Sequence, residues 1–273
     1  MIGIIGAICG DAIGVPYEFY QGTNIKTTDF ELVTKDTRIS DDSIHTLAIA
    51  YWLMHTDRSA EALSNKIVEF TNLYSGYGYG GLMAKYCLSY KKLRPYNSWG
   101  NGSGMRVSPV AWVAQDIDEC LELAELSASV SHNHPEGIKG AKAVAIATWM
   151  NRNGYSKDAI KANVVDLTGY DLDRKIDDIR PTYHFEVSCQ KSVPESILCW
   201  LESNSYEECI RNAISMGGDA DTMACMAGAI CNANPETQIS DELVAKILMK
   251  EDGAMMDNFL RDIFNEFHER YEI

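Results

Sequence analysis

The sequence predicts an all-α protein that folds as a single compact multi-helix domain. Three observations lead to this prediction. Apolar residues recur at helical spacing along almost the whole chain, the segments between these stretches are short, and no Pro/Ser-rich linker or fixed-period repeat divides the 273 residues. Helices that each bury an apolar stripe must pack around a common core. We therefore expect residues 1–273 to form one domain of roughly a dozen helices.

The first helices follow directly from the residue pattern. Residues 1–15 are apolar or small on all sides, which predicts a buried central helix. Unpaired buried charge is costly, so Asp11 within this helix is expected to cap a neighbouring helix. Glu18, just past the expected helix end, is a better candidate for a site residue. Residues 44–54 form a strongly apolar helix, and residues 59–74 form an amphipathic one.

The rest of the chain continues the helical pattern. Two polar stretches interrupt it: residues 20–39, expected to be a loop with room for a short strand, and residues 166–184, expected to be an exposed insertion. The remaining helices are expected at residues 82–93, 105–114, 117–130, 136–152, 189–203, 205–216, 221–233, 240–249 and 255–271.

Composition limits the classes of function. The formal net charge is −15, from 39 acidic and 24 basic residues. This charge argues against broad contact with nucleic acid or an anionic membrane, because both attract basic surfaces. It leaves open a nucleotide-like ligand held by a few N–H groups and a metal ion.

The cysteines and the N-terminus bear on the compartment. The eight cysteines include no CxxC pair, and most lie in apolar helical stretches, which indicates reduced thiols. The apolar N-terminus lacks a basic region, and no segment has the character of a membrane span. We therefore expect a soluble, cytoplasmic protein without a membrane partner.

The stretch from Ile214 to Ile230 combines a glycine pair, two aspartates with a threonine, and a run of small apolar residues. The glycine pair breaks the preceding helix, and Asp219, Asp221 and Thr222 stand where the next helix begins. A simple N-cap needs one aspartate, not two. Two carboxylates and a hydroxyl in the loop and first turn of a helix suit a hard cation such as Mg²⁺.

A second copy of this pattern lies at residues 40–43, Ser-Asp-Asp-Ser, before the helix expected at residues 44–54. One such segment is explained by helix capping. Two segments that each offer a pair of aspartates could converge on one or two divalent cations. Two-metal sites of this kind activate water or a leaving oxygen.

Two glycine-rich loops could contact a ligand. Gly76, Gly78 and Gly81 match GxGxxG, but a helix precedes them instead of a strand, so the dinucleotide-binding interpretation fails. Their N–H groups could cradle a diphosphate, although such a stretch is more often only a loop. In the second loop, residues 97–106, Trp99 could stack on a base or plug the core.

A His-x-His segment, His132 and His134, follows farther along the chain. Direct zinc ligation is disfavoured, because no Cys or Asp stands at a usable spacing and strand context is missing. Hydrogen bonding near a site is the favoured role.

Taken in this order, these segments resemble the ADP-ribosylglycohydrolase family, which includes the dinitrogenase reductase-activating glycohydrolase. The ordered set is specific, whereas any single member would be weak. The matching stretches are Gly10–Glu18, Ser40–Asp42, Gly76–Gly81, Ser98–Arg106, Ser131–Pro135 and Gly217–Thr222.

The resemblance implies an all-helical fold with two Mg²⁺ or Mn²⁺ ions at the base of an ADP-ribose cleft. Glu18, Asp41, Asp42 and Asp219 are the catalytic candidates that it implies. The implied metal ligands are Ser40, Asp41, Asp42, Asp219, Asp221 and Thr222, with Ser40 in place of the more frequent Thr.

The resemblance also implies a substrate-binding set. Gly78, Gly80 and Gly81 match the diphosphate loop. The loop that holds the ribose and adenine region is matched by Ser98, Trp99, Asn101 and Gly102, and His132 matches a histidine near the ligand.

The implied activity is hydrolysis of an N- or O-glycosidic ADP-ribosyl linkage, with release of ADP-ribose from a modified protein or small molecule. Two alternatives stay open. A catalytically silent ADP-ribose-binding or structural relative is one, although such a protein need not keep both ligand sets. A helical metal-dependent phosphohydrolase is the other, but such enzymes usually use a His-Asp pair, and the chain has no His-Asp dipeptide.

Overall fold

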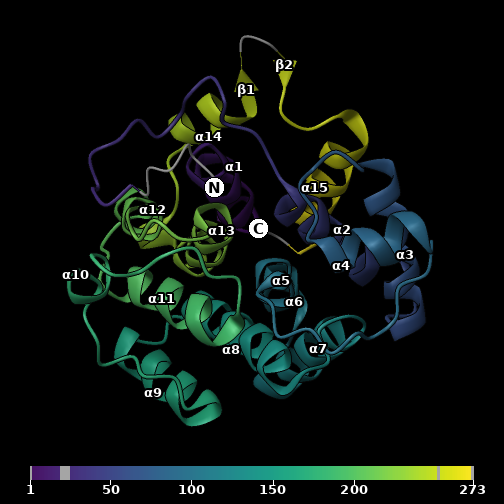
Figure 1. The fold of residues 1–273 in the computed structure, drawn as a ribbon, viewed down its shortest axis with the longest axis horizontal. Helices are drawn as coiled ribbons and strands as arrows, with labels where there is room; N and C mark the ends of the chain where they lie inside the picture. The colour runs from purple at the N-terminus through teal and green to yellow at the C-terminus, as the bar shows by residue number, and fades with distance from the viewer. Residues whose placement is uncertain (1, 19–24, 251–252, 272–273) are drawn as a thin grey trace.

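Two helices far apart in the sequence form the centre of the molecule. The computed structural model describes residues 2–18, 25–250 and 253–271, and in it α1 (Ile5–Glu18) packs along α13 (Ala220–Cys231) (Figure 1). Glycines make this close packing possible. A Cβ atom on Gly10 would lie 2.2 Å from the carbonyl oxygen of Ala224, and one on Gly14 would lie 2.4 Å from the Cα atom of Asp221. The two helix backbones therefore touch where larger side chains would separate them.

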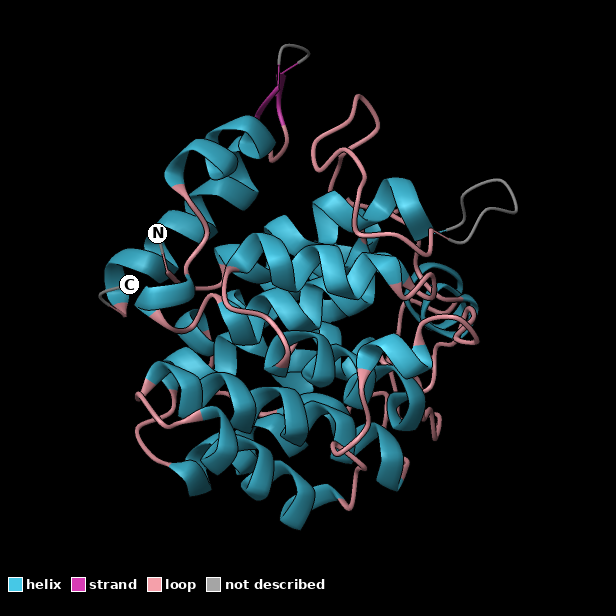
Figure 2. Ribbon diagram, turned by 90° about the vertical axis from the view of Figure 1, so that its left-hand side faces the viewer, coloured by secondary structure: helices cyan, strands magenta, loops and turns pink. Residues whose placement is uncertain are grey.

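The other helices surround this pair and share one continuous apolar core, so the predicted all-α class is confirmed. Figure 2 shows helices throughout the described chain and one small hairpin at its edge. The surrounding helices are α2 (Asp41–His55), α3 (Ala60–Leu73), α4 (Gly81–Ala84), α5 (Gly102–Met105), α6 (Ser108–Val113), α7 (Ile117–Ser129), α8 (Pro135–Arg152), α9 (Lys157–Thr168), α10 (Ile176–Ile179), α11 (Cys189–Leu201), α12 (Tyr206–Ser215), α14 (Asp241–Leu248) and α15 (Asn258–Arg270), with a π-helical turn η1 (Lys85–Ser89) and a 3-10 turn η2 (Pro235–Thr237).

Asp11 caps α2, as expected. Its carboxylate accepts the backbone N–H of Ser40 at 3.0 Å and that of Ser43 at 3.1 Å. The hydroxyls of both serines also donate to it. Free N–H groups at a helix start need such acceptors, and an anion there interacts favourably with the helix dipole. The central helix thus holds the start of α2 in place.

Four local predictions were wrong. The first helix runs through Pro16, so Glu18 lies in its last turn instead of just past its end. The helix expected at residues 82–93 is the short α4 followed by η1, which ends at Ser89. The helix expected at residues 105–114 is split, because α5 ends at Met105 and α6 begins at Ser108. The helix expected at residues 240–249 ends at Leu248, and the strands β1 (Met249–Lys250) and β2 (Gly253–Ala254), which were not predicted, form an antiparallel hairpin before α15. Residues 25–39 contain no strand, and residues 19–24 lie outside the described chain.

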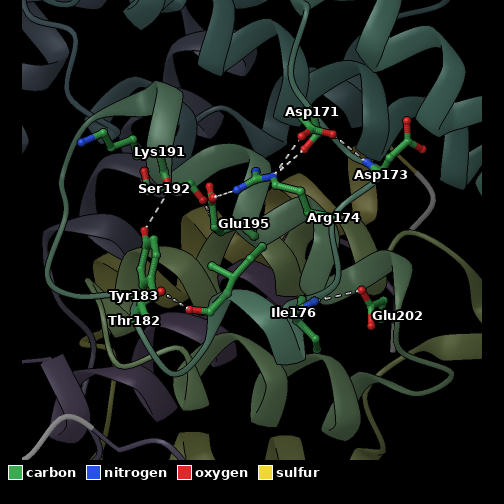
Figure 3. Close-up of polar contacts among 12 residues, drawn as sticks. Asp171, Asp173, Arg174, Ile176, Thr182, Tyr183, Lys191, Ser192, Glu195 and Glu202 are labelled. Atoms are coloured by element: carbon green, nitrogen blue, oxygen red, sulfur yellow. Dashed lines mark hydrogen bonds and ion pairs between the residues drawn. The ribbon is translucent and has the colours of Figure 1, made fainter.

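The segment from residue 166 to 184 is not simply an exposed insertion. Leu172 and Ile176 are buried in the core, and Arg174 forms an ion pair with the buried Glu195 of α11 at 2.7 Å. Figure 3 shows this contact beside the hydrogen bond from the Tyr183 hydroxyl to the carbonyl oxygen of Lys191, at 3.0 Å. These contacts attach the segment to α11, and its continuation, residues 185–188, reaches the cavity described below.

Two other expectations concern the whole chain. All eight cysteines are buried and free, in agreement with reduced thiols. Within the described residues, no helix combines the length and the apolar character that crossing a membrane requires.

Candidate active site

A cavity of about 800 Å³ opens where the end of α1 meets the first turns of α2 and α13. That volume suits a ligand of nucleotide or drug size. The structure brings most of the sequence-predicted site residues to this one cavity. Those that line it are Glu18, Ser40, Asp41, Asp42, Gly78, Gly80, Gly81, Ser98, Asn101, Gly102, His132, Asp219, Asp221 and Thr222.

Carboxylates from three helix ends meet at the cavity. One oxygen each of Glu18, Asp219 and Asp221 lie within 4.8 Å of one another. The turn that places the two aspartates depends on Gly217, whose φ of +64° lies in the left-handed region that glycine adopts readily. On the α2 side, Oδ1 of Asp42 lies 3.5 Å from the hydroxyl of Thr222. The two acidic motifs of the sequence therefore converge.

The cluster has an excess of negative charge. Burial, followed by the neighbouring carboxylates, raises the pKa of Asp41, Asp42 and Asp221 well above the usual range. Burial and Asp219 raise the pKa of Glu18 to about 7. Within the described part of the chain, no ion pair joins these carboxylates to a lysine or arginine. Buried like charges without a counter-charge are unfavourable.

A metal ion would relieve this excess. Oδ2 of Asp42 is buried without a hydrogen-bond partner among the described residues. The available donors are all oxygens, the ligand type that Mg²⁺ and other hard divalent cations prefer. The cluster could therefore hold a metal ion, and its chemistry fits one.

Neighbouring polar groups orient the cluster. The side-chain amide of Asn101 donates to Oδ2 of Asp219 at 2.7 Å. The hydroxyl of Ser40 donates to Asp11 at 2.7 Å and accepts the backbone N–H of Asp42 at 3.2 Å. Ser40 is thus the N-cap of α2, and its contact with a metal stays a prediction.

The first glycine loop lies beside the acidic cluster. The backbone N–H of Asp41 donates to the carbonyl oxygen of Tyr77 at 2.8 Å. Gly78 has a φ of +94°, and a Cβ atom there would lie 3.7 Å from Oδ1 of Asp41. Gly80 and Gly81 have open space where a side chain would be. This wall of the cavity therefore presents backbone in place of side chains, so that a ligand could approach the N–H groups.

Trp99 is the one predicted site residue that the structure does not bring to the cavity. Its side chain is 52% exposed and lies edge-on to the ring of His134, with ring centroids 5.7 Å apart. Phe185 and Val187 line the cavity instead. The sequence shows that an aromatic residue is in this loop, but not on which side of the loop it lies.

Two buried residues that line the cavity, His45 and Arg106, were not among the candidates that the sequence offered. Each is the one ionisable residue among largely apolar neighbours, His45 within residues 44–50 and Arg106 between Met105 and Val107. An ionisable residue among apolar neighbours was the available signal, because such a residue is buried only at a cost.

A sequence profile of the ADP-ribosylglycohydrolase family matches residues 2–272. The chain belongs to this family. The resemblance inferred from the ordered motifs is thereby confirmed.

Individual relatives agree with this assignment. ADP-ribosylhydrolase ARH3 of Mus musculus is 23% identical over 304 residues, which cover 84% of this chain and 82% of the mouse protein. Human ARH3 is 26% identical over 181 residues, which cover 50% of each protein. An uncharacterized protein of Archaeoglobus fulgidus is 31% identical over 147 residues, 48% of each protein. The last two matches span about half of the relative's length. Family and relatives support a hydrolase of the ADP-ribosylglycohydrolase family.

The fold has a solved counterpart. A structure described as an ADP-ribosylglycohydrolase-related protein complex superposes with a TM-score of 0.66 at 19% identity, over 89% of this chain and 93% of that one. This agreement confirms the helical fold of the family.

Proposed function

We propose that this protein is a metal-dependent hydrolase that cleaves the N- or O-glycosidic bond between ADP-ribose and an acceptor, and releases ADP-ribose. The observation that carries the proposal is the convergence of the acidic residues of α1, α2 and α13 at a cavity walled by glycine-rich backbone. The acceptor would be a modified protein side chain or a small molecule.

Asp41, Asp42, Asp219 and Asp221 would hold one or two divalent cations, with Thr222 beside them. Mg²⁺ or Mn²⁺ fits a set of oxygen donors. A cation bound there supplies Lewis-acid polarisation of ligand oxygens.

The chain's own residues would bind and orient the substrate. Backbone N–H groups around Gly78, Gly80 and Gly81 would contact the diphosphate, since successive N–H groups form an anion-binding concavity. Ser98, Asn101, Gly102 and His132 line the adjoining wall and would contact the ribose. Trp99 would act only as part of the outer rim.

Glu18 is the carboxylate best suited to move a proton. Its pKa of about 7 lets it hold or release a proton near neutral pH, which general acid–base catalysis requires. It is only partly buried, whereas Asp42 and Asp219 are more than nine-tenths buried. In the proposed reaction a water oxygen bonds to C1″ of the distal ribose, the bond from C1″ to the acceptor breaks, and the acceptor gains the proton that the water loses through Glu18.

Calorimetric titration of ADP-ribose tests the binding part of the proposal without knowledge of the acceptor. We expect binding with Mg²⁺ present and markedly weaker binding in EDTA. A folded protein that binds ADP-ribose in neither condition would contradict the proposal.

Release of ADP-ribose from ADP-ribosyl-arginine and ADP-ribosyl-serine peptides then tests catalysis and linkage. Glu18→Gln should bind ADP-ribose but lose at least about 100-fold in turnover, the usual contribution of a general acid or base. Binding without hydrolysis of either linkage by the wild type would favour a silent ADP-ribose-binding relative.

A further inference from the structure

Arg106 is a fully buried arginine at the wall of the cavity. Its Nη2 donates to the carbonyl oxygen of Ser127 and to the hydroxyl of Ser131, both at 2.8 Å. Its Nε and Nη1 atoms have no hydrogen-bond partner, and no carboxylate pairs with it, among the residues that the structure describes. A buried guanidinium held only by neutral acceptors is unfavourable for stability alone.

Ser131 links this guanidinium to His132. Arginine can only donate hydrogen bonds, so the Ser131 oxygen is the acceptor in its bond with Arg106. The hydrogen of the Ser131 hydroxyl is then left to donate, and Nδ1 of His132 lies 2.7 Å away. If Nδ1 carried a proton instead, the described residues would leave the buried Ser131 hydrogen without an acceptor, which is destabilising.

This series of hydrogen bonds determines the tautomer of the His132 ring. A neutral ring whose Nδ1 accepts a hydrogen bond carries its hydrogen on Nε2. Burial, together with the positive charge of Arg106 and the proximity of His45, holds the pKa of His132 well below its usual range. The ring is therefore neutral.

The Nε2 atom of His132 faces the second glycine loop. A Cβ atom on Gly102 would lie 2.9 Å from it, and one on Gly100 would lie 3.7 Å from it. Both glycines line the cavity. Within the described chain Nε2 of His132 forms no hydrogen bond. Unlike Nδ1 of His45, it is not sealed from solvent. Its hydrogen remains available to a ligand.

We propose that Arg106 is a positioning residue that acts through Ser131 to hold His132 as the neutral Nε2–H tautomer, a fixed hydrogen-bond donor to a phosphate or ribose oxygen of the ligand. The identity of the ligand rests on the proposed function, whereas the tautomer does not. The positive charge of the Arg106 guanidinium polarises the Ser131 hydroxyl and strengthens the hydrogen bond from Ser131 to His132.

The first test is nuclear magnetic resonance of the ligand-free, full-length protein. Long-range ¹H–¹⁵N correlation spectra at pH 7 distinguish protonated from unprotonated imidazole nitrogens, and the signals of His132 are those lost in His132→Gln. We expect an unprotonated Nδ1 and a protonated Nε2. An Nδ1–H tautomer or an imidazolium would overturn the proposal, and this experiment requires no variant that perturbs the Arg106 network.

The second test is a double-mutant cycle on ADP-ribose affinity. Ser131→Ala should weaken binding about tenfold, the loss expected for one well-made hydrogen bond. His132→Gln keeps an N–H donor at the end of the side chain but does not need Ser131, so Ser131→Ala in that background should cost less than about twofold. Equal losses in both backgrounds would show that Ser131 does not act through His132.

Ser129→Ala is the matched control. Ser129 lies two residues earlier, and its hydroxyl donates to the carbonyl oxygen of Glu125 at 2.7 Å, away from the network. We expect unchanged ADP-ribose affinity in this variant. A wild-type protein with the Nε2–H tautomer but no affinity for ADP-ribose would support the positioning role and contradict the proposed function.

Discussion

The side-chain amide of Asn101 donates to the carboxylate of Asp219 across 2.7 Å, and both residues are buried. The bond joins segments 118 residues apart in the sequence. It satisfies one oxygen of Asp219 and orients the carboxylate within the acidic cluster. Where a carboxylate ligates a metal, a partner that orients it in this way typically strengthens metal binding by about 10- to 100-fold.

Asn101→Ala should weaken Mg²⁺ or Mn²⁺ binding about 10- to 100-fold, the usual effect of removing such a contact. Calorimetric titration with each metal alone measures this change. Asn153→Ala, at the exposed end of α8, is the control and should bind metal as the wild type does. Equal affinities in the two variants would contradict the role of Asn101.

Asp11→Asn should destabilise the protein by about 3 kcal/mol, because the amide would turn an N–H group toward the donors of Ser40 and Ser43. Urea denaturation measures the loss. Asp57→Asn alters an exposed carboxylate that accepts the N–H of Ser59, and the loss there should be much smaller. A stable Asp11→Asn protein would mean that water or another group caps α2.

Cation binding should stabilise the protein more at pH 8 than at pH 5. Glu18 has its ordinary pKa near 4.5 when unfolded and about 7 when folded. Between these values the unfolded state loses its proton first, so the stability of the metal-free protein falls as pH rises. A cation that binds only the folded state offsets this loss.

Thermal unfolding with MgCl₂ and with EDTA, from pH 5 to pH 8, checks this prediction. The gain in Tm on adding Mg²⁺ should grow with pH, and Glu18→Gln should flatten the pH dependence in EDTA. A gain independent of pH would indicate that the carboxylates are already ionised without the metal.

Acid should destabilise the protein through His45. Burial and the nearby Arg106 lower the pKa of His45 to about 3. The hydroxyl of Thr71 donates to Ile67, so Nε2 of His45 donates to Thr71, and Nδ1 has no partner in the described chain. As pH falls below about 6.5 the unfolded state binds a proton that the folded state excludes, so stability falls toward pH 3.

At pH 5 this effect is on the order of 2 kcal/mol relative to pH 7. The difference between urea unfolding free energies at these two pH values should be smaller in His45→Gln by about that amount. His45→Gln also changes packing and so shifts the unfolding free energy at every pH. Only the pH dependence of that free energy tests the titration of His45. Identical pH dependence in both proteins would mean that the pKa of His45 is the same in the folded and unfolded states.

Gly10→Ala should be strongly destabilising. A Cβ atom there would lie 2.2 Å from the carbonyl oxygen of Ala224, so α1 and α13 would have to separate. Overpacking of this kind typically costs about 1–3 kcal/mol, and backbone contacts leave little room to relax. Gly80→Ala is the control for stability, since nothing lies within 4 Å of its added Cβ. Equal unfolding temperatures would contradict the close packing.

Much of the fold could be read from local pattern. The apolar, small-residue character of residues 1–15 and of Met223–Ile230 predicted buried helices, and both lie at the centre of the molecule. Helical periodicity depends on nearest neighbours along the chain, so a sequence carries it directly. The burial of Leu172 depends on contacts with distant segments, and the local pattern did not predict it. The hairpin of β1 and β2 pairs close neighbours, but strands of two residues are too short to show an alternating pattern.

The candidate site was also predictable only in part. The types of residue needed for an oxygen-donor metal site, and their place at helix starts, were visible at Asp41 and Asp219. Their convergence could only be expected from the sequence, because the two motifs lie about 180 residues apart and the fold alone brings them together. Side-chain direction was not visible at all: Trp99 lies outside the cavity, and Phe185 reaches it from just after the segment interpreted as an exposed insertion.

The sequence by itself determined most of the helices, the acidic helix starts and the family, because these depend on local order and on motifs in series. Only the tertiary structure decided that Arg106 lies beneath the cavity and contacts His132 through Ser131. The physical reason is that the state of a buried polar group depends on the donors and acceptors folded around it, and residues far along the chain supply most of them.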